Sequence, residues 1–207
     1  MPGMAANVAE NAKAFTDSVE LSTQKEEITK TRFVDEKTKQ HIMRFDEENT
    51  ILSRFKEDEI NFNEYDVVLV SDYGKGFLRD FSTKGIELKN KLFYVDTKRS
   101  DLSSFANSII KINEKESNEI NQKTLDDTSM IIVTLGSKGA KFKEKIYETN
   151  KVDIFDVSGA GDTFLVAFAV YHYLTQDIDD AIGFANKCAC LVVQRPGTSP
   201  LTPQLLN

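Results

Sequence analysis

Residues 66–76 read DVVLVSDYGKG, and the pattern of this stretch indicates the fold class because three later segments repeat it. A continuous apolar run ends in polar and glycine residues. The pattern recurs at LFYV (92–95), SIIKI (108–112) and MIIVTL (130–135), each followed by polar or glycine residues. Apolar runs that do not alternate are typical of parallel strands covered on both faces. The sequence therefore predicts an α/β domain with a mainly parallel central sheet.

The segments between these runs are long enough to cross back over the sheet. FLRDFSTKGIELKNK (77–91) is interpreted as one crossover helix. Residues 164–173 are apolar almost all round, which favours a central helix, whereas 178–192 carry one apolar stripe at helical spacing. Because ligands bind beyond the carboxyl ends of strands in open parallel sheets, we expect the polar loops to converge on one site.

The first fifty residues are less regular. Residues 5–15 favour a short helix, and a lysine- and glutamate-rich stretch follows it. Two short segments, 31–34 and 41–45, flank the polar sequence DEKTKQ and predict a β-hairpin. We place this hairpin at 29–46 within a single domain spanning 1–207.

Composition narrows the function classes. The chain has 207 residues, 40% of them hydrophobic, which suffices for one sizeable core. Its net charge of -7 argues against nonspecific binding to nucleic acid or to an anionic membrane surface. Cys188 and Cys190 are the only cysteines, so a disulfide scaffold or thiolate zinc site is not expected. Neither a signal peptide nor a membrane-length apolar run is evident, and we expect a cytoplasmic protein.

The sequence SGAGD (158–162) opens the predicted helix 164–173. Backbone amides at a helix start lack intrahelical partners and attract anions, and glycine lets a ligand approach closely. A carboxylate at Asp162 would repel a phosphate unless it serves as the base for the attacking group. The alternative is that Ser158 or Asp156 caps the helix and Asp162 only favours its first turn. The P-loop and dinucleotide fingerprints are both absent.

These motifs carry a family resemblance. DVSGAGDTFLVAF (156–168) resembles the C-terminal signature of the ribokinase-like (PfkB) carbohydrate kinases, and PGMAANVA (2–9) resembles their N-terminal signature. SDYGKG, VD-K, N-x-x-E and GTS follow one another as in the D-glycero-β-D-manno-heptose 7-phosphate kinase branch. The resemblance is nearly continuous over 66–207. It implies a ribokinase-like three-layer fold and ATP-dependent phosphorylation of a sugar or sugar phosphate with Mg²⁺, a need for K⁺ being left open.

The resemblance also assigns residues. Asp162 matches the family's catalytic base, and the amides around Gly159, Ala160 and Gly161 match its anion hole. Glu116 would contact magnesium through water, although Asn113 and Glu116 alone also fit a helix cap with its capping-box acid. The residues on the ATP side are Asn113, Glu114, Lys115, Glu116, Thr134, Gly136, Gly139 and Asn186. The residues on the acceptor side are Gly3, Asn7, Asp72 and Lys75.

Two of these residues have plainer interpretations. Without the resemblance, Asn186 fits a polar residue on a helix surface, and Lys75 fits a solvated lysine in a glycine turn. With the resemblance, Lys75 would pair with a substrate phosphate.

The chain departs from the family on the acceptor side. Met4 replaces the second glycine of the N-terminal signature, the opening strand is absent, and a short polar bridge between Phe15 and about Glu27 replaces further βα units. Two alternatives to an active kinase therefore stay open. One is a remnant or regulatory module that binds nucleotide without an acceptor site. The other is a structural subunit that forms a homodimer through the hairpin 29–46, which resembles the lid of the family.

Overall fold

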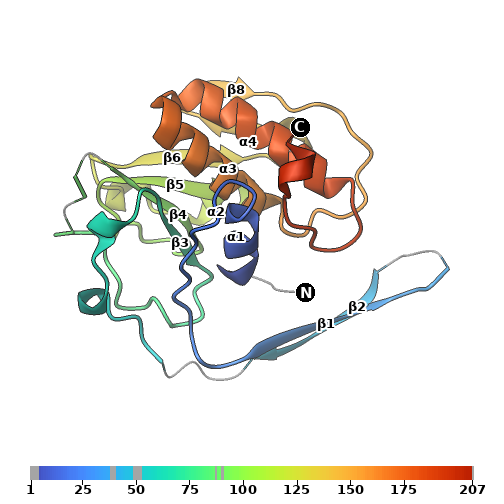
Figure 1. The fold of residues 1–207 in the computed structure, drawn as a ribbon, viewed down its shortest axis with the longest axis horizontal. Helices are drawn as coiled ribbons and strands as arrows, with labels where there is room; N and C mark the ends of the chain where they lie inside the picture. Colours follow the sequence, from blue (N-terminus) through green and yellow to red (C-terminus); the bar gives the residue numbers. More distant parts are fainter. Residues whose placement is uncertain (1–4, 38–40, 49–52, 87, 90, 207) are drawn as a thin grey trace.

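The structure, a computed structural model, describes residues 5–37, 41–48, 53–86, 88–89 and 91–206. Within these residues a six-stranded sheet has the order β3-β4-β5-β6-β7-β8 (Figure 1). The first four strands are parallel and the last two are antiparallel. The strands are β3 (Val68–Asp72), β4 (Phe93–Thr97), β5 (Ser108–Asn113), β6 (Met130–Thr134), β7 (Ala140–Phe142) and β8 (Lys145–Tyr147).

Alternate residues of the central strands face two separate apolar clusters. Tyr94 and Ile109 pack with the helices α3 (Ala160–Thr175) and α4 (Ile178–Val193). On the other face, Phe93 and Ile110 pack with aromatic side chains from loops. Since both faces are covered, continuous apolar strands are what this position requires. The predicted α/β class with a mainly parallel sheet and the two C-terminal helices are confirmed.

The predicted crossover helix over 77–91 is wrong. The described residues of this segment form turns, and Gly85 has φ +83°. The Thr83 hydroxyl donates to the carbonyl of Ala106 at 2.8 Å and accepts from its amide at 2.7 Å. Side-chain bonds of this kind offer the backbone an alternative to helix formation. The face of the sheet is covered by Phe81 from this segment rather than by a helix.

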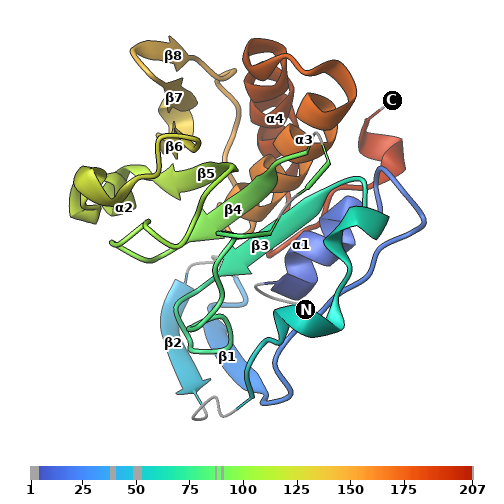
Figure 2. The same cartoon turned by 90° about the vertical axis from the view of Figure 1, so that its left-hand side faces the viewer.

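Two short helices and a hairpin complete the fold. α1 (Ala5–Ala12) packs against α3, and α2 (Glu114–Glu119) follows β5 directly. The hairpin β1 (Ile28–Val34) and β2 (His41–Glu48) is antiparallel and projects from the body of the molecule (Figures 1 and 2).

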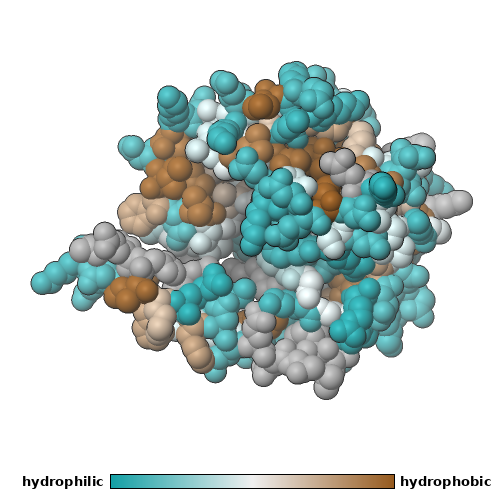
Figure 3. Space-filling view, turned by 180° about the vertical axis from the view of Figure 1, so that it is seen from behind, coloured by the Kyte–Doolittle hydropathy of each residue, from teal (hydrophilic) through white to brown (hydrophobic). Residues whose placement is uncertain are grey.

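One face of the hairpin is apolar and exposed. Phe33 pairs with Met43, and Phe45 lies two residues further along on the same face. These three side chains are about half exposed, and apolar side chains are visible on the projecting arm in Figure 3. A face of this kind has no partner within the described part of the chain.

Candidate active site

The helix α3 begins where the sequence predicts. Gly159 is its N-cap residue with φ +86°, and no side chain caps the helix. Asp156 instead accepts a hydrogen bond from the amide of Ser158 at 2.8 Å, so the capping alternative is not realised. The Ala160 amide donates to a carbonyl of the preceding turn at 3.2 Å. Within the described chain, the amides of Gly159 and Gly161 have no such partner and remain for a ligand.

Glycine is required at position 159, and at position 161 it leaves room for a neighbouring side chain. A Cβ on Gly159 would lie 2.8 Å from Nδ2 of Asn7, and φ +86° is strained for any other residue. A Cβ on Gly161 would lie 3.0 Å from Nζ of Lys111. Glycine at these positions therefore lets an amide and an ammonium approach the start of α3.

Asp162 lies in the first turn of α3 and is 6% exposed. Its Oδ2 accepts from Nδ2 of Asn7 at 2.7 Å, and its Oδ1 accepts from the Tyr73 hydroxyl at 2.8 Å. Burial raises the pKa of Asp162 above its ordinary value, although the bonds from Asn7 and Tyr73 oppose this. Further away, Asp96 raises the same pKa and Lys111 lowers it. A carboxylate with a raised pKa, held by two donors, suits a general base.

The side-chain oxygen of Asn7 lies beside this contact and is left without a hydrogen bond from the described residues. This atom, Oδ1, is buried. Unsatisfied buried acceptors are costly, and they mark places where a ligand donor fits. Asn11 of the same helix accepts from Thr163 at 2.7 Å and so ties α1 to α3. The sequence-predicted pair Asn7 and Asp162 is thus in direct contact.

A buried ion pair that sequence reasoning missed lies under the start of α3. Nζ of Lys111 on β5 is 2.6 Å from Oδ2 of Asp96 on β4, and both side chains are nearly buried. These residues are neighbours in the parallel register. A lysine inside the apolar run SIIKI was the available signal, because a buried lysine needs a partner.

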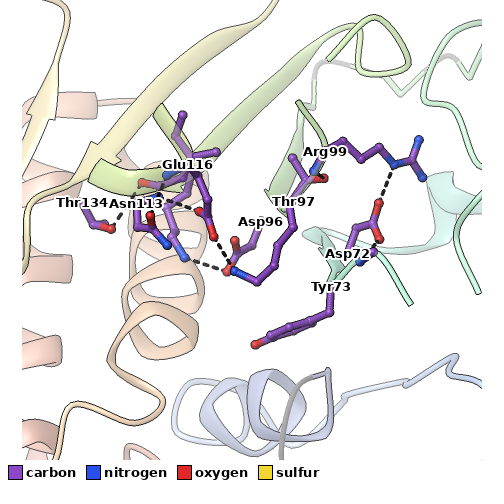
Figure 4. A network of polar contacts seen from close by, with 12 residues as sticks. Asp72, Tyr73, Asp96, Thr97, Arg99, Asn113, Glu116 and Thr134 are labelled. Atoms are coloured by element: carbon purple, nitrogen blue, oxygen red, sulfur yellow. Dashed lines mark hydrogen bonds and ion pairs between the residues drawn. The ribbon is translucent and has the colours of Figure 1, made fainter. Parts of the chain in front are cut away.

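Three of the predicted ATP-side residues lie close together at the ends of β5 and β6, namely Asn113, Glu116 and Thr134 (Figure 4). Asn113 accepts from the amide of Glu116 at 2.9 Å, and Glu116 accepts from the amide of Asn113 at 2.8 Å. This is the capping box that the spacing permits. Thr134 is the register partner of Asn113, and Gly136 begins the turn after β6. Glu114 and Lys115 are exposed in the first turn of α2.

Glu116 also contacts a cation from the loop that follows β4. Lys98 forms an ion pair with its Oε1. Burial alone would raise the pKa of Glu116, but the bonds from Lys98 and from the Asn113 amide outweigh it, so this pKa lies below its ordinary value. A carboxylate that stays ionised near the ATP-side loops suits an indirect contact with a metal.

Gly139 and Asn186 meet at one backbone carbonyl. The Asn186 side chain is 6% exposed and donates from Nδ2 to the Tyr147 carbonyl at 2.8 Å, so it does not lie on the surface. A Cβ on Gly139 would lie 2.0 Å from the same oxygen. Both residues therefore contribute to the packing of the β7–β8 corner against α4.

On the acceptor side, Asp72 is engaged within the protein. It is 5% exposed, and its Oδ2 is 2.6 Å from Nε of Arg99, while its Oδ1 accepts from the Gly74 amide at 2.9 Å. Lys75 is half-buried and lines a groove of about 620 Å³ between α1 and the outer edge of β3. Gly3, the fourth residue predicted there, lies outside the described residues.

The donors suit magnesium only as a companion of phosphate groups. No group of three or more His, Cys, Asp or Glu side chains among the described residues could hold a metal ion. Both oxygens of Glu116 already accept bonds from protein groups. Magnesium commonly keeps several waters and binds through one or two carboxylates plus substrate phosphates. The residues present are compatible with such an ion, which Glu116 would reach only through water because both of its oxygens are engaged.

Among the described residues, none of the helices has the length and the apolar character that crossing a membrane requires.

Comparisons with known proteins identify the family of the chain. Residues 7–205 match the model of the pfkB family of carbohydrate kinases. The chain is 30% identical to the bifunctional protein HldE of Campylobacter curvus over 77% of its own length and 40% of that protein. It is 29% identical to the HldE of Aliarcobacter butzleri over 95% of its length and 49% of that protein. The chain thus spans less than half the length of these relatives.

Solved structures show the same fold. A ribokinase from Thermotoga maritima gives a TM-score of 0.64 at 23% identity, covering 86% of this chain and 68% of that one. A nucleoside kinase from Methanocaldococcus jannaschii gives 0.60 at 18% identity, covering 87% and 67%. At these identities the likeness establishes the ribokinase-like fold.

Proposed function

Because the chain belongs to the pfkB family of carbohydrate kinases, we propose that it transfers the γ-phosphoryl group of ATP to a hydroxyl of a sugar or sugar phosphate. One observation carries the proposal. The buried carboxylate of Asp162 lies at the start of α3, in the same turn as the unpartnered amides of Gly159 and Gly161. A base and an anion site are thereby adjacent, which is what in-line phosphoryl transfer needs.

The chemistry assigns one task to each group. Asp162 takes the proton of the attacking hydroxyl, and the hydroxyl oxygen forms the new bond to the γ-phosphorus. The bond from phosphorus to the bridging oxygen breaks, and its electrons leave with ADP. The amides of Gly159 and Gly161 and the ammonium of Lys111 offset the charge on the transferring group. Magnesium, when bound with ATP, supplies further charge neutralisation near Asn113 and Glu116.

The acceptor that we propose is a heptose phosphate, in a route to ADP-heptose for surface polysaccharide. The order of the motifs and the relatives named HldE support this choice. Oδ1 of Asn7, which accepts no hydrogen bond from the described residues, would accept one from a sugar hydroxyl. Lys75 would pair with the substrate phosphate. Asp72 is proposed to act on the acceptor through the shape of its loop, because both of its oxygens are already engaged.

The test is ATP turnover with a panel of sugars and sugar phosphates, with the product identified by mass spectrometry. We expect Asp162→Asn to lose about 10²–10⁴-fold in kcat, the usual contribution of a general base. Asp177→Asn is the matched control, since Asp177 only caps α4. The proposal fails if the wild type and Asp162→Asn are equally inert on every acceptor.

A second candidate is a module that binds nucleotide without transferring phosphate. It is favoured by the edge of β3, which pairs only with β4 within the described residues and leaves the groove beside it open. Calorimetry separates the two candidates. Binding of ATP without binding of any sugar supports the module, whereas binding of both ligands supports the kinase.

We also propose self-association through the hairpin 29–46. Its exposed apolar face, with Phe33 and Met43, would be covered by a second copy. Sedimentation of the chain with and without 29–46 tests this. A wild-type chain that sediments as a monomer would contradict this proposal.

A further inference from the structure

Tyr73 makes a contact that neither the family signatures nor the proposed mechanism uses. Its hydroxyl donates to Oδ1 of Asp162 at 2.8 Å, and it comes from the loop after β3, 89 residues away in sequence. Figure 4 shows its side chain extending away from Asp72 and Arg99. Burial, and then the charge of Asp162, raise the pKa of Tyr73, so its hydroxyl keeps its proton and remains a donor.

The loop that carries Tyr73 is held at several points. Nε of Arg99 pairs with Asp72 at 2.6 Å on one side of Tyr73. The guanidinium also donates to the carbonyls of Leu78 and Phe81 on the other side. Because a guanidinium is planar, it can make several hydrogen bonds to one loop at a small cost in side-chain freedom, and these bonds hold the shape of the loop. The chain on both sides of Tyr73 is therefore anchored to Arg99.

A cation connects Tyr73 with the ATP side. Nζ of Lys98 lies 5.8 Å from the centroid of the Tyr73 ring and also pairs with Glu116. The ring thus lies between the carboxylate of Asp162 and an ammonium that belongs to the ATP-side cluster. The other groups that act on Asp162 are Asn7 of α1, Asp96 of β4 and Lys111 of β5.

We propose that Tyr73 is a positioning residue, whose hydroxyl holds the carboxylate of Asp162 deprotonated and oriented for proton transfer. The inference rests on the proposed function, in which Asp162 is the base. Oδ1 is taken by Tyr73 and Oδ2 by Asn7, so the carboxylate cannot rotate without losing a bond. A donor to the charged form stabilises that form, which counteracts the effect of burial. Without Tyr73, Asp162 would bind its proton at higher pH.

The experiment compares Tyr73→Phe with the wild type by two measurements. In the ligand-free protein, carboxyl ¹³C NMR gives the titration midpoint of Asp162, assigned by loss of its signal in Asp162→Asn. We expect the midpoint to rise by about one pH unit, because a hydrogen bond to a charged group is of that size. In turnover, the acidic limb of kcat/KM should move by the same amount, while the KM for ATP stays unchanged.

The matched control is Tyr171→Phe, since Tyr171 is a partly buried tyrosine on α3 that stacks on Phe184. We expect no shift in either measurement for this variant. An unmoved NMR midpoint in a folded Tyr73→Phe protein overturns the positioning role. A raised midpoint in a chain that turns over no acceptor supports the contact but contradicts the proposed function. The two failures are therefore distinguishable.

Discussion

The Lys111→Met variant tests whether the ion pair beneath the active site holds the sheet together. It removes an ammonium that lies 2.6 Å from Oδ2 of Asp96, with the two side chains 7% and 11% exposed. The carboxylate of Asp96 then loses the ammonium that pairs with it. At an effective dielectric constant of about 20, the lost attraction is about 6 kcal/mol, part of which is offset by the easier solvation of a single charge. Measured losses for broken buried pairs are about 3–5 kcal/mol.

A loss of that size is large against the total stability of a domain, about 5–15 kcal/mol. The double variant Asp96→Leu/Lys111→Met removes both charges, so neither charged group is left buried without its partner. Because such replacements of buried pairs are often neutral, we expect the double variant to be within about 2 kcal/mol of the wild type. The second substitution should thus restore most of what the first removes.

The assay is urea unfolding at pH 7, followed by circular dichroism, for each single variant and the double variant. Lys145→Met is the control, since Lys145 pairs with Asp179 at 3.3 Å while both are about 60% exposed. An exposed pair contributes about 0–1 kcal/mol. The reasoning is refuted if Lys111→Met costs no more than Lys145→Met, or if the double variant is less stable than either single variant.

Two further expectations concern small residues. Gly159→Ala should destabilise the fold by about 1–3 kcal/mol in thermal unfolding, because φ is +86° and the new Cβ would lie 2.8 Å from Asn7. Gly183→Ala, with no atom within 4 Å of its Cβ inside α4, should be neutral or stabilising by up to about 1 kcal/mol, and equal costs would contradict the strain argument. Burial raises the pKa of Cys188 to about 12, so at pH 8 it is almost entirely thiol and should resist iodoacetamide. The partly exposed Cys190 should react first in peptide mass spectrometry; early modification of Cys188 would show that α4 opens readily.

The parts of the fold that could be predicted are those that local patterns determine. Continuous apolar runs gave the four parallel strands, and SGAGD gave the start of α3. The segment 77–91 failed because its structure depends on a bond between Thr83 and the loop at Ala106, which no local pattern reveals. The short strands β7 and β8 went unpredicted for a similar reason, since strands of three residues show too little alternation to be recognised.

The same distinction applies to the site. Asn113 and Glu116 are three residues apart, so their spacing alone predicts the reciprocal cap that the structure contains. Tyr73 and Lys111 act on Asp162 across 89 and 51 positions, and only the order and register of the strands bring them together. A single sequence carries no such distances. The sequence does show one anomaly, Lys111, which is a charged residue within the apolar run of a predicted buried strand.

The two halves of the site differ in how firmly the fold holds them. The proposed ATP half lies on β5 and β6 in the middle of the sheet, whereas the proposed acceptor half lies on the edge strand β3 and on α1. An eight-residue helix is not stable alone, so α1 depends on its contacts with α3. Val8 and Ala12 pack against Val166, and Asn7 and Asn11 bond to Asp162 and Thr163.

Any local opening of α1 therefore removes a donor from Asp162 as well as a wall from the groove. Under the proposed function, a sugar bound between α1 and β3 would stabilise the docked position of α1 by mass action and, with it, the hydrogen bond from Asn7 to Asp162.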